Sequence, residues 1–180
     1  MPLTFAGHMT LHMVVVAIAA PLVALAVAGS RADPVRRLPR LIAPIPLAMI
    51  ELLVVWTWHV PALHDAARHH AGVFLVEQVS FAIAGILLWV AAIGGDAEQR
   101  RVRAGAGIAA LLFTSMHMTL LGALFALSNR PLFRHAPGPA EVALIADQHL
   151  GGVIMLLVGS ASYLFGALSL TVIALRPRPV

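Results

Sequence analysis

The stretch AGVFLVEQVSFAIAGILLWVAAIG, residues 71–94, is almost entirely apolar, and Glu77 is its only charged residue. A helix needs about 20 predominantly apolar residues to cross the ~30 Å hydrocarbon core of a bilayer, so the stretch predicts a transmembrane helix. Four other stretches have the same character. Together they predict an all-α polytopic membrane bundle of five transmembrane helices, over residues 8–29, 41–60, 71–94, 104–128 and 149–175.

The composition of the whole chain is that of a membrane protein. Of its 180 residues, 60% are hydrophobic and 11% are charged, and the mean hydropathy is +0.90. A soluble domain carries roughly 25% charged residues. The connectors are too short to hold a soluble domain, so residues 1–180 are expected to form a single transmembrane domain. The first apolar stretch follows no basic segment and is expected to be a retained helix, not a cleaved signal.

The arginines predict the orientation in the membrane. They fall between the apolar stretches and not on one exposed face, which indicates membrane topology and no nucleic-acid binding. Only Arg68, Arg130 and Arg134 lie on one side. The other side holds Arg31, Arg36, Arg37, Arg40, Arg100, Arg101, Arg103, Arg176 and Arg178. The positive-inside rule therefore predicts an outer N-terminus and a cytoplasmic C-terminus in the inner (plasma) membrane of the cell.

The absence of cysteine limits the chemistry. Disulfides, iron–sulfur clusters, thiolate metal sites and thiol catalysis are all excluded. A metal would have to be held by histidine, methionine or carboxylate. The sequence also has no nucleophile elbow and no HExxH helix, so we do not expect an enzyme.

All nine histidines lie on the side where arginines are scarce. His8, His12, His59 and His149 stand at the outer ends of predicted helices, and His117 is expected roughly 16 Å below the outer end of its helix. This segregation predicts one polar centre in the outer half of the bundle. The other four are expected to be solvated: His64, His69, His70 and His135.

The motif HMTLHM, residues 8–13, is the strongest candidate for metal binding. The spacing of i to i+4 places His8 and His12 on one face of a helix, with Met9 and Met13 about 100° round it. A second helix supplies MHM, residues 116–118. Imidazole nitrogen and thioether sulfur together suit Cu(I). The alternative is that the histidine pair is interfacial and that the methionines only pack.

Three carboxylates are candidates for a supporting role around this centre. Glu51 and Glu77 lie inside predicted spans, where an ionisable group is costly and normally faces the bundle interior with a partner. The alternative for each is a neutral acid that holds two helices together. Asp147 precedes Gly151 and Gly152, which permit close helix approach, and it could instead cap the last helix.

Five motifs in order resemble one family. HMTLHM followed by AAPLVAL, WTWHVPALHDAA, VEQVSFAIAGILLW, MHMTLLGALF and DQHLGG are together similar to the caa3-type cytochrome c oxidase assembly factors of the CtaG family. The resemblance runs from about His8 to Gly159. In this chain HMTLHM lies in the first predicted helix, whereas members of the family usually have one or two helices before it.

The resemblance implies an all-helical membrane protein that helps to mature haem–copper oxidases by serving their copper centres, with oxidase subunits as partners. It carries over onto His8, His12, His59, Glu77, His117, Asp147 and His149. We therefore predict a copper-binding, chaperone-like assembly factor in the lipid bilayer, which could form a homo-oligomer. The predicted Cu(I) ligands are His8, His12, His59, His117, His149, Met9, Met13 and Met118, supported by Glu77, Asp147 and Glu51.

Two other functions fit the same residues. Histidines on four different predicted helices could ligate a haem in pairs, which would make this a redox membrane protein. Alternatively, the histidines could only form hydrogen bonds, which would make the chain a structural scaffold without metal.

Overall fold

The computed structural model describes residues 4–133 and 139–176, and within them the regular structure is helical. In chain order the elements are α1 (Phe5–Met13), the π-helix η1 (Val14–Ala19), α2 (Ala20–Val27), α3 (Pro34–Arg37), α4 (Pro44–Trp58), α5 (Pro61–His69), α6 (Ala71–Ile93), α7 (Ala97–Leu127), α8 (Pro139–Ile154), the π-helix η2 (Met155–Gly159) and α9 (Ser160–Leu175).

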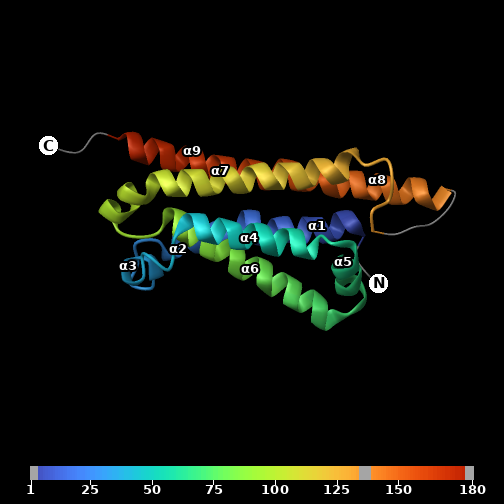
Figure 1. Cartoon of the computed structure of the whole chain (residues 1–180), viewed down its shortest axis with the longest axis horizontal. Coiled ribbons are helices and arrows are strands. Elements are labelled where there is room, and N and C mark those ends of the chain that lie inside the picture. The colour runs from blue at the N-terminus through green and yellow to red at the C-terminus, as the bar shows by residue number, and fades with distance from the viewer. Residues whose placement is uncertain (1–3, 134–138, 177–180) are drawn as a thin grey trace.

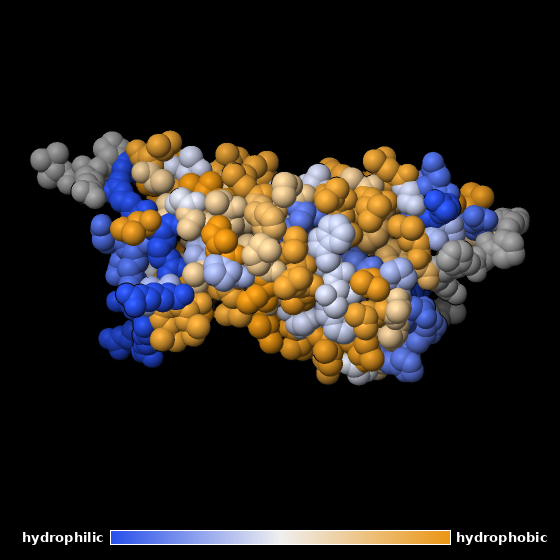
Figure 2. Space-filling view, in the orientation of Figure 1, coloured by the Kyte–Doolittle hydropathy of each residue, from blue (hydrophilic) through white to orange (hydrophobic). Residues whose placement is uncertain are grey.

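The elements form up to five passes through a membrane. Four continuous helical runs are long and apolar enough to cross, and the bent pair of α4 and α5 provides a fifth candidate. The long helices lie side by side along one axis, with the start of α1 and the end of α9 at opposite ends (Figure 1). An apolar band separates two hydrophilic ends (Figure 2). The predicted all-α membrane bundle is confirmed.

The two hydrophilic ends differ in their residues. We call one the arginine end, which comprises residues 28–43, residues 94–103 and Arg176. We call the other the histidine end, which comprises the start of α1, residues 59–70, residues 128–133 and the start of α8. The arginine end carries α3, and the histidine end carries α5 (Figure 1).

The second predicted span ends earlier than the sequence indicated, and its connector is helical. α4 stops at Trp58, and α5 leaves it at a bend of 72°. Pro61 at the first position of α5 explains the bend, because a proline ring is compatible with a helix start but removes a backbone donor from a continuing helix. The connector thus folds across the histidine end instead of forming an open loop.

Two helices begin earlier in the chain than the sequence predicted. α7 begins at Ala97 and not at residue 104, because Asp96 and Gln99 form a capping box that extends the helix through its arginines. The last helical run begins at Pro139 and not at His149. Asp147 is therefore inside a helix and cannot cap the start of its own.

Glycines allow the last helical run to lie close to its neighbours. A Cβ atom at Gly152 would stand 2.5 Å from the backbone nitrogen of Ala126, and one at Gly151 would stand 2.5 Å from the ring of Phe5. Real Cβ atoms do not approach so closely. The predicted close approach at this glycine pair is confirmed, and it fixes α8 against both α1 and α7.

Candidate metal site at the histidine end

The start of α1 is held by two caps. The hydroxyl of Thr4 accepts a hydrogen bond from the amide of Gly7 at 3.1 Å. The carboxylate of Asp147, from α8, accepts from the amides of Phe5 at 2.7 Å and Ala6 at 3.2 Å. These are free amides of a helix N-terminus, where a negative charge is also favourable. Asp147 thus sets the position of the turn that carries His8.

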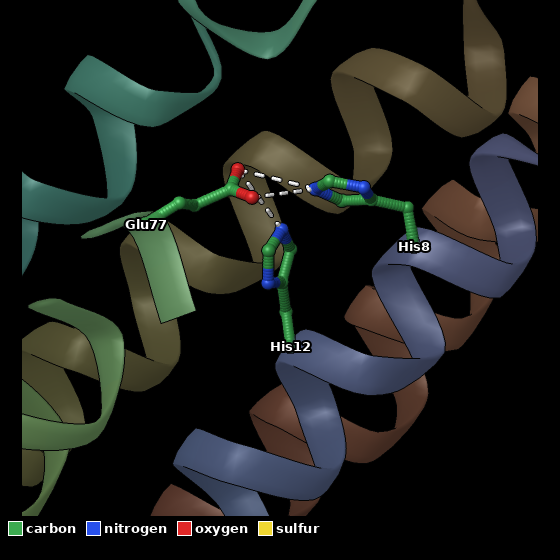
Figure 3. A group of neighbouring side chains, drawn as sticks. All are labelled: His8, His12 and Glu77. Carbon is green, nitrogen blue, oxygen red and sulfur yellow. Dashed lines mark hydrogen bonds and ion pairs between the residues drawn. The ribbon is translucent and has the colours of Figure 1, made fainter. Parts of the chain in front are cut away.

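His8, His12 and Glu77 bring three ligand atoms together. Nε2 of His8 lies 3.0 and 3.1 Å from the two carboxylate oxygens of Glu77, and Nε2 of His12 lies 3.5 Å from one of them (Figure 3). Spacing of i to i+4 places both imidazoles on one face of α1. The carboxylate comes from α6, which also starts at the histidine end. All three side chains are at most 1% exposed.

Met9 and His59 form a second pair of donor atoms beside this group. His59 ends α4, and its Nδ1 lies 2.7 Å from the carbonyl oxygen of Val55. Its Nε2 lies 3.4 Å from the sulfur of Met9. Because a carbonyl can only accept, Nδ1 carries the proton, and Nε2 presents a lone pair to the thioether. The ring of His59 is 5.8 Å from that of His12, between centroids.

His64 is a site residue that the sequence analysis missed, and Gln78, described below, is another. It was expected to be solvated, but α5 turns it inward until it is 0% exposed, with its ring 4.7 Å from that of His8. Neither ring nitrogen has a hydrogen-bond partner. The signal was present in PALHDAA, because His64 and Ala67 are three residues apart on the buried face of a helix.

Phenyl rings enclose the imidazoles and exclude water. Phe81 lies 4.3 Å from the ring of His12, and Phe133 lies 4.4 Å from the ring of His64. Phe125 stacks on His59. A buried cation here would lose its hydration, so it would have to be held by several donor atoms at once.

A polar neighbour orients His12. The amide nitrogen of Gln78 lies 3.2 Å from Nδ1 of His12 and 3.3 Å from Glu77, while its amide oxygen is buried without a partner. Trp58 on α4 donates to Ser80 at 2.8 Å, which fixes the same segment of α6 against α4. Gln78 is therefore positioned to form a hydrogen bond with the imidazole of His12.

Two predicted ligands lie elsewhere. His117 is buried on α7 with neither nitrogen bonded, and its described ring neighbour is Phe113, one turn away on the same helix. Nε2 of His149 lies 2.9 Å from the carbonyl of Ser128, which ties α8 to the end of α7. Among the described residues, the group of three ligands that could hold one ion is His8, His12 and Glu77, and it contains neither of them, nor His59. Both side chains face other neighbours than the group of His8, His12 and Glu77.

The other predicted site residues are also spread along the bundle. Met13 and Met118 both pack against Gly159. They lie farther from the histidine end than Met9 does. Glu51 is buried and accepts a hydrogen bond from the hydroxyl of Tyr163, about 12 Å along α4 from His59. This contact between α4 and α9 matches the alternative reading of Glu51 as an acid that joins two helices.

The histidines that were expected to be solvated differ in their exposure. His69 and His70 are exposed, as predicted, and His69 lies 3.4 Å from Asp65. His64 is buried, as described above. His135 lies outside the described residues.

The fold and the site together define a polytopic helical membrane protein with a buried cluster of imidazole, carboxylate and thioether groups at one end. The sequence profile of the cytochrome c oxidase caa3 assembly factors matches residues 1–176. The chain therefore belongs to this family, which supports a role in cytochrome oxidase assembly and confirms the resemblance seen in the motifs. Comparison with curated proteins and with solved structures gave no match.

Proposed function

We propose that this protein binds copper at the histidine end and presents it to, or receives it from, a subunit of a cytochrome c oxidase. Copper is the cargo, and the protein is not an enzyme. The positive-inside rule places the histidine end on the outer face of the inner (plasma) membrane. This proposal adds to the assembly role of the family the metal that is transferred, copper, and the side of the membrane on which it is bound.

The Met9 and His59 pair is the observation that carries the proposal. Both facing atoms offer lone pairs, so both could bind one metal ion placed between them. With bonds of about 2.0 Å to nitrogen and 2.3 Å to sulfur, a tetrahedral ion holds such ligands roughly 3.5 Å apart. The observed separation is 3.4 Å. Thioether with imidazole is a donor set that favours Cu(I).

The His8, His12 and Glu77 group supports the same conclusion. A nitrogen and an oxygen ligand around a tetrahedral ion lie roughly 3.4 Å apart, close to the distances of 3.0 to 3.5 Å between the imidazole nitrogens and the oxygens of Glu77. Imidazole and carboxylate alone would also suit zinc or iron, so the thioether of Met9 is what selects copper. The negative charge of Glu77 would offset the charge of the ion in a water-excluded site. His64, with both nitrogens free, is a further ligand that this site can recruit.

Gln78 can serve the metal-bound form of His12. If Nε2 of His12 holds copper, Nδ1 carries the proton and needs an acceptor. A rotation of the Gln78 amide would turn its unpartnered oxygen to that proton, since amide oxygen and nitrogen occupy equivalent positions. Ligating histidines generally donate their second N–H in this way.

The haem alternative fits this packing less well. That alternative pairs histidines of different helices, and His12 and His59 are such a pair. Phe81 lies 4.3 Å from the ring of His12, and Phe125 stacks on His59. Two axial ligands of a haem must approach from opposite faces of the macrocycle. Phenyl rings occupy the space beside these imidazoles, so the cluster lacks the slot that a macrocycle needs.

A genetic experiment tests the function. In a strain without the chromosomal copy, His12→Ala should leave the protein in the membrane but lower cytochrome oxidase activity. Excess copper should partly restore the activity, because raising free metal compensates a weakened site by mass action. His69→Ala, an exposed histidine at the same end, is the matched control and should retain full activity.

Two results would reject the proposal. A deletion strain with normal oxidase activity at low copper would remove the need for this protein in assembly. An inactive His12→Ala strain whose oxidase carries its full copper complement would separate the protein from copper supply and favour the scaffold hypothesis.

A further inference from the structure

A groove opens at the arginine end, between the first and the last helical runs. Its volume is about 490 Å³, which is ample for a lipid acyl chain. Leu25 of α2, Trp89 of α6 and Phe165 of α9 form its apolar walls, and Arg100 of α7 lies at one end. Leu25 and Phe165 are more than 60% exposed, so the groove faces outward, toward the surrounding bilayer.

The length of the groove matches one leaflet. Its lining residues on α9 run from Ser162 to Ile173, which corresponds to roughly 16 Å along a helix. Half of the hydrocarbon core of a bilayer is about 15 Å thick. The groove thus runs from the middle of the membrane to the level of the headgroups on the arginine side.

Arg100 is unusually placed for a surface arginine. Its Nη2 donates to the carbonyl of Gly95 at 3.2 Å, while its Nε is buried without a hydrogen-bond partner. Arg36 donates to the carbonyl of Gly29 at 3.1 Å, and a Cβ atom at Gly29 would lie 3.8 Å from Arg100 Nη2. The two guanidinium groups therefore converge on one point beside the groove.

Neighbouring carboxylates do not neutralise these two arginines. Asp33 is the buried acid of the described arginine end, and its oxygens accept from the backbone amides of Gly29, Val35 and Gly95. Among residues 4–133 and 139–176, no ion pair joins Arg36 or Arg100 to a carboxylate. In that part of the chain the arginine end has three acids, Asp33, Asp96 and Glu98, and eight arginines: Arg31, Arg36, Arg37, Arg40, Arg100, Arg101, Arg103 and Arg176.

We propose that the groove binds one anionic phospholipid, with an acyl chain along Leu25 and Phe165 and the phosphate on Arg100 and Arg36. A basic pocket between transmembrane helices is the arrangement that recognises an acidic headgroup. The apolar walls require a chain as well as a phosphate, and the unpaired arginines require net negative charge. The inference does not depend on the copper site or on the orientation of the bundle.

Native mass spectrometry of the full-length protein tests this proposal. The protein is released from mixed micelles that contain phosphatidylglycerol or phosphatidylcholine. We expect one retained phosphatidylglycerol per chain, bound at least fivefold more tightly than phosphatidylcholine. Arg100→Gln should reduce that preference about fivefold, the weight of one arginine near a charged headgroup. Arg37→Gln, an exposed arginine of the same end that does not line the groove, should keep it.

A second variant keeps the test decisive if Arg100→Gln fails to fold. Ser169→Phe places a ring in the groove from an exposed position on α9, and it should reduce retention of both lipids. Three results would overturn the proposal. The wild type could bind the two lipids equally, Arg37→Gln and Arg100→Gln could lose the preference for phosphatidylglycerol equally, or inorganic phosphate alone could occupy the site. Recovery of a prenylated quinone or a tetrapyrrole from the groove would also overturn it.

Discussion

Met9, His12 and His59 show how individual side chains prepare the candidate site. Each is buried, and a named neighbour contacts Nδ1 of each imidazole: the carbonyl of Val55 for His59 and the amide of Gln78 for His12. Burial makes such neighbours decisive, because an unsatisfied polar atom away from water costs about 1–3 kcal/mol. We therefore expect strong effects on metal binding from residues that do not contact the metal.

Substitutions of Gln78 test whether a residue that does not contact the metal affects its binding. Gln78→Leu removes the acceptor for Nδ1–H of His12 and should weaken copper binding about 10–100-fold, as loss of such partners typically does. Gln78→Glu keeps an acceptor and should recover most of the affinity. Competition with a Cu(I) chelator measures both. Equal affinities in the wild type and in Gln78→Leu would show that the amide has no part in the site.

At the scale of elements, α1 and α5 explain what the sequence could and could not predict. Spacing within HMTLHM was sufficient to place His8 and His12 on one face, because helical periodicity is local. The inward turn of His64 was missed, because it depends on helix α5, which lies between the predicted spans 41–60 and 71–94. The partners of His117 and His149 depend on how helices rotate against each other, and glycine contacts such as Gly152 with Ala126 decide that rotation.

Asp147 tests the link between α8 and the site. Asp147→Ala removes the acceptor for the first amides of α1 and should lower the free energy of unfolding by about 1 kcal/mol, with weaker copper binding as a consequence of the displaced turn. Asp147→Asn retains a good cap and should restore most of both. Thermal unfolding in detergent and chelator competition give the two readouts.

The control for this experiment is Asp65→Ala, an exposed acid at the same end of the molecule. It should change neither quantity. If Asp147→Asn loses as much copper affinity as Asp147→Ala while the protein unfolds normally, the carboxylate acts on the metal by its charge and not through α1.

The whole molecule is a rod with two chemically different ends, and the sequence alone predicted this. Long apolar runs specify transmembrane helices almost independently of their neighbours, since each backbone group must be satisfied within its own helix. The segregation of arginine from histidine likewise needed no tertiary information. The lateral arrangement of the helices, the helical connector α5 and the early starts of α7 and α8 required the structure.

Orientation is the prediction that belongs to the molecule as a whole. Single cysteines at Ala32, at the arginine end, and at Ala66, on α5, should react differently in intact cells. A membrane-impermeant thiol reagent should label the protein with cysteine at position 66 and leave the one at position 32 unlabelled, and permeabilised cells should label both. The opposite pattern would place the histidine cluster in the cytoplasm.

Copper coordination by the purified protein tests the central claim most directly. X-ray absorption of the anaerobic, Cu(I)-loaded protein should show nitrogen scatterers at about 2.0 Å and a sulfur scatterer at about 2.3 Å. The sulfur should disappear in Met9→Leu, and binding should fall in His12→Ala but not in His69→Ala. A protein that binds no copper, or holds it without sulfur and unaffected by these variants, would contradict the account.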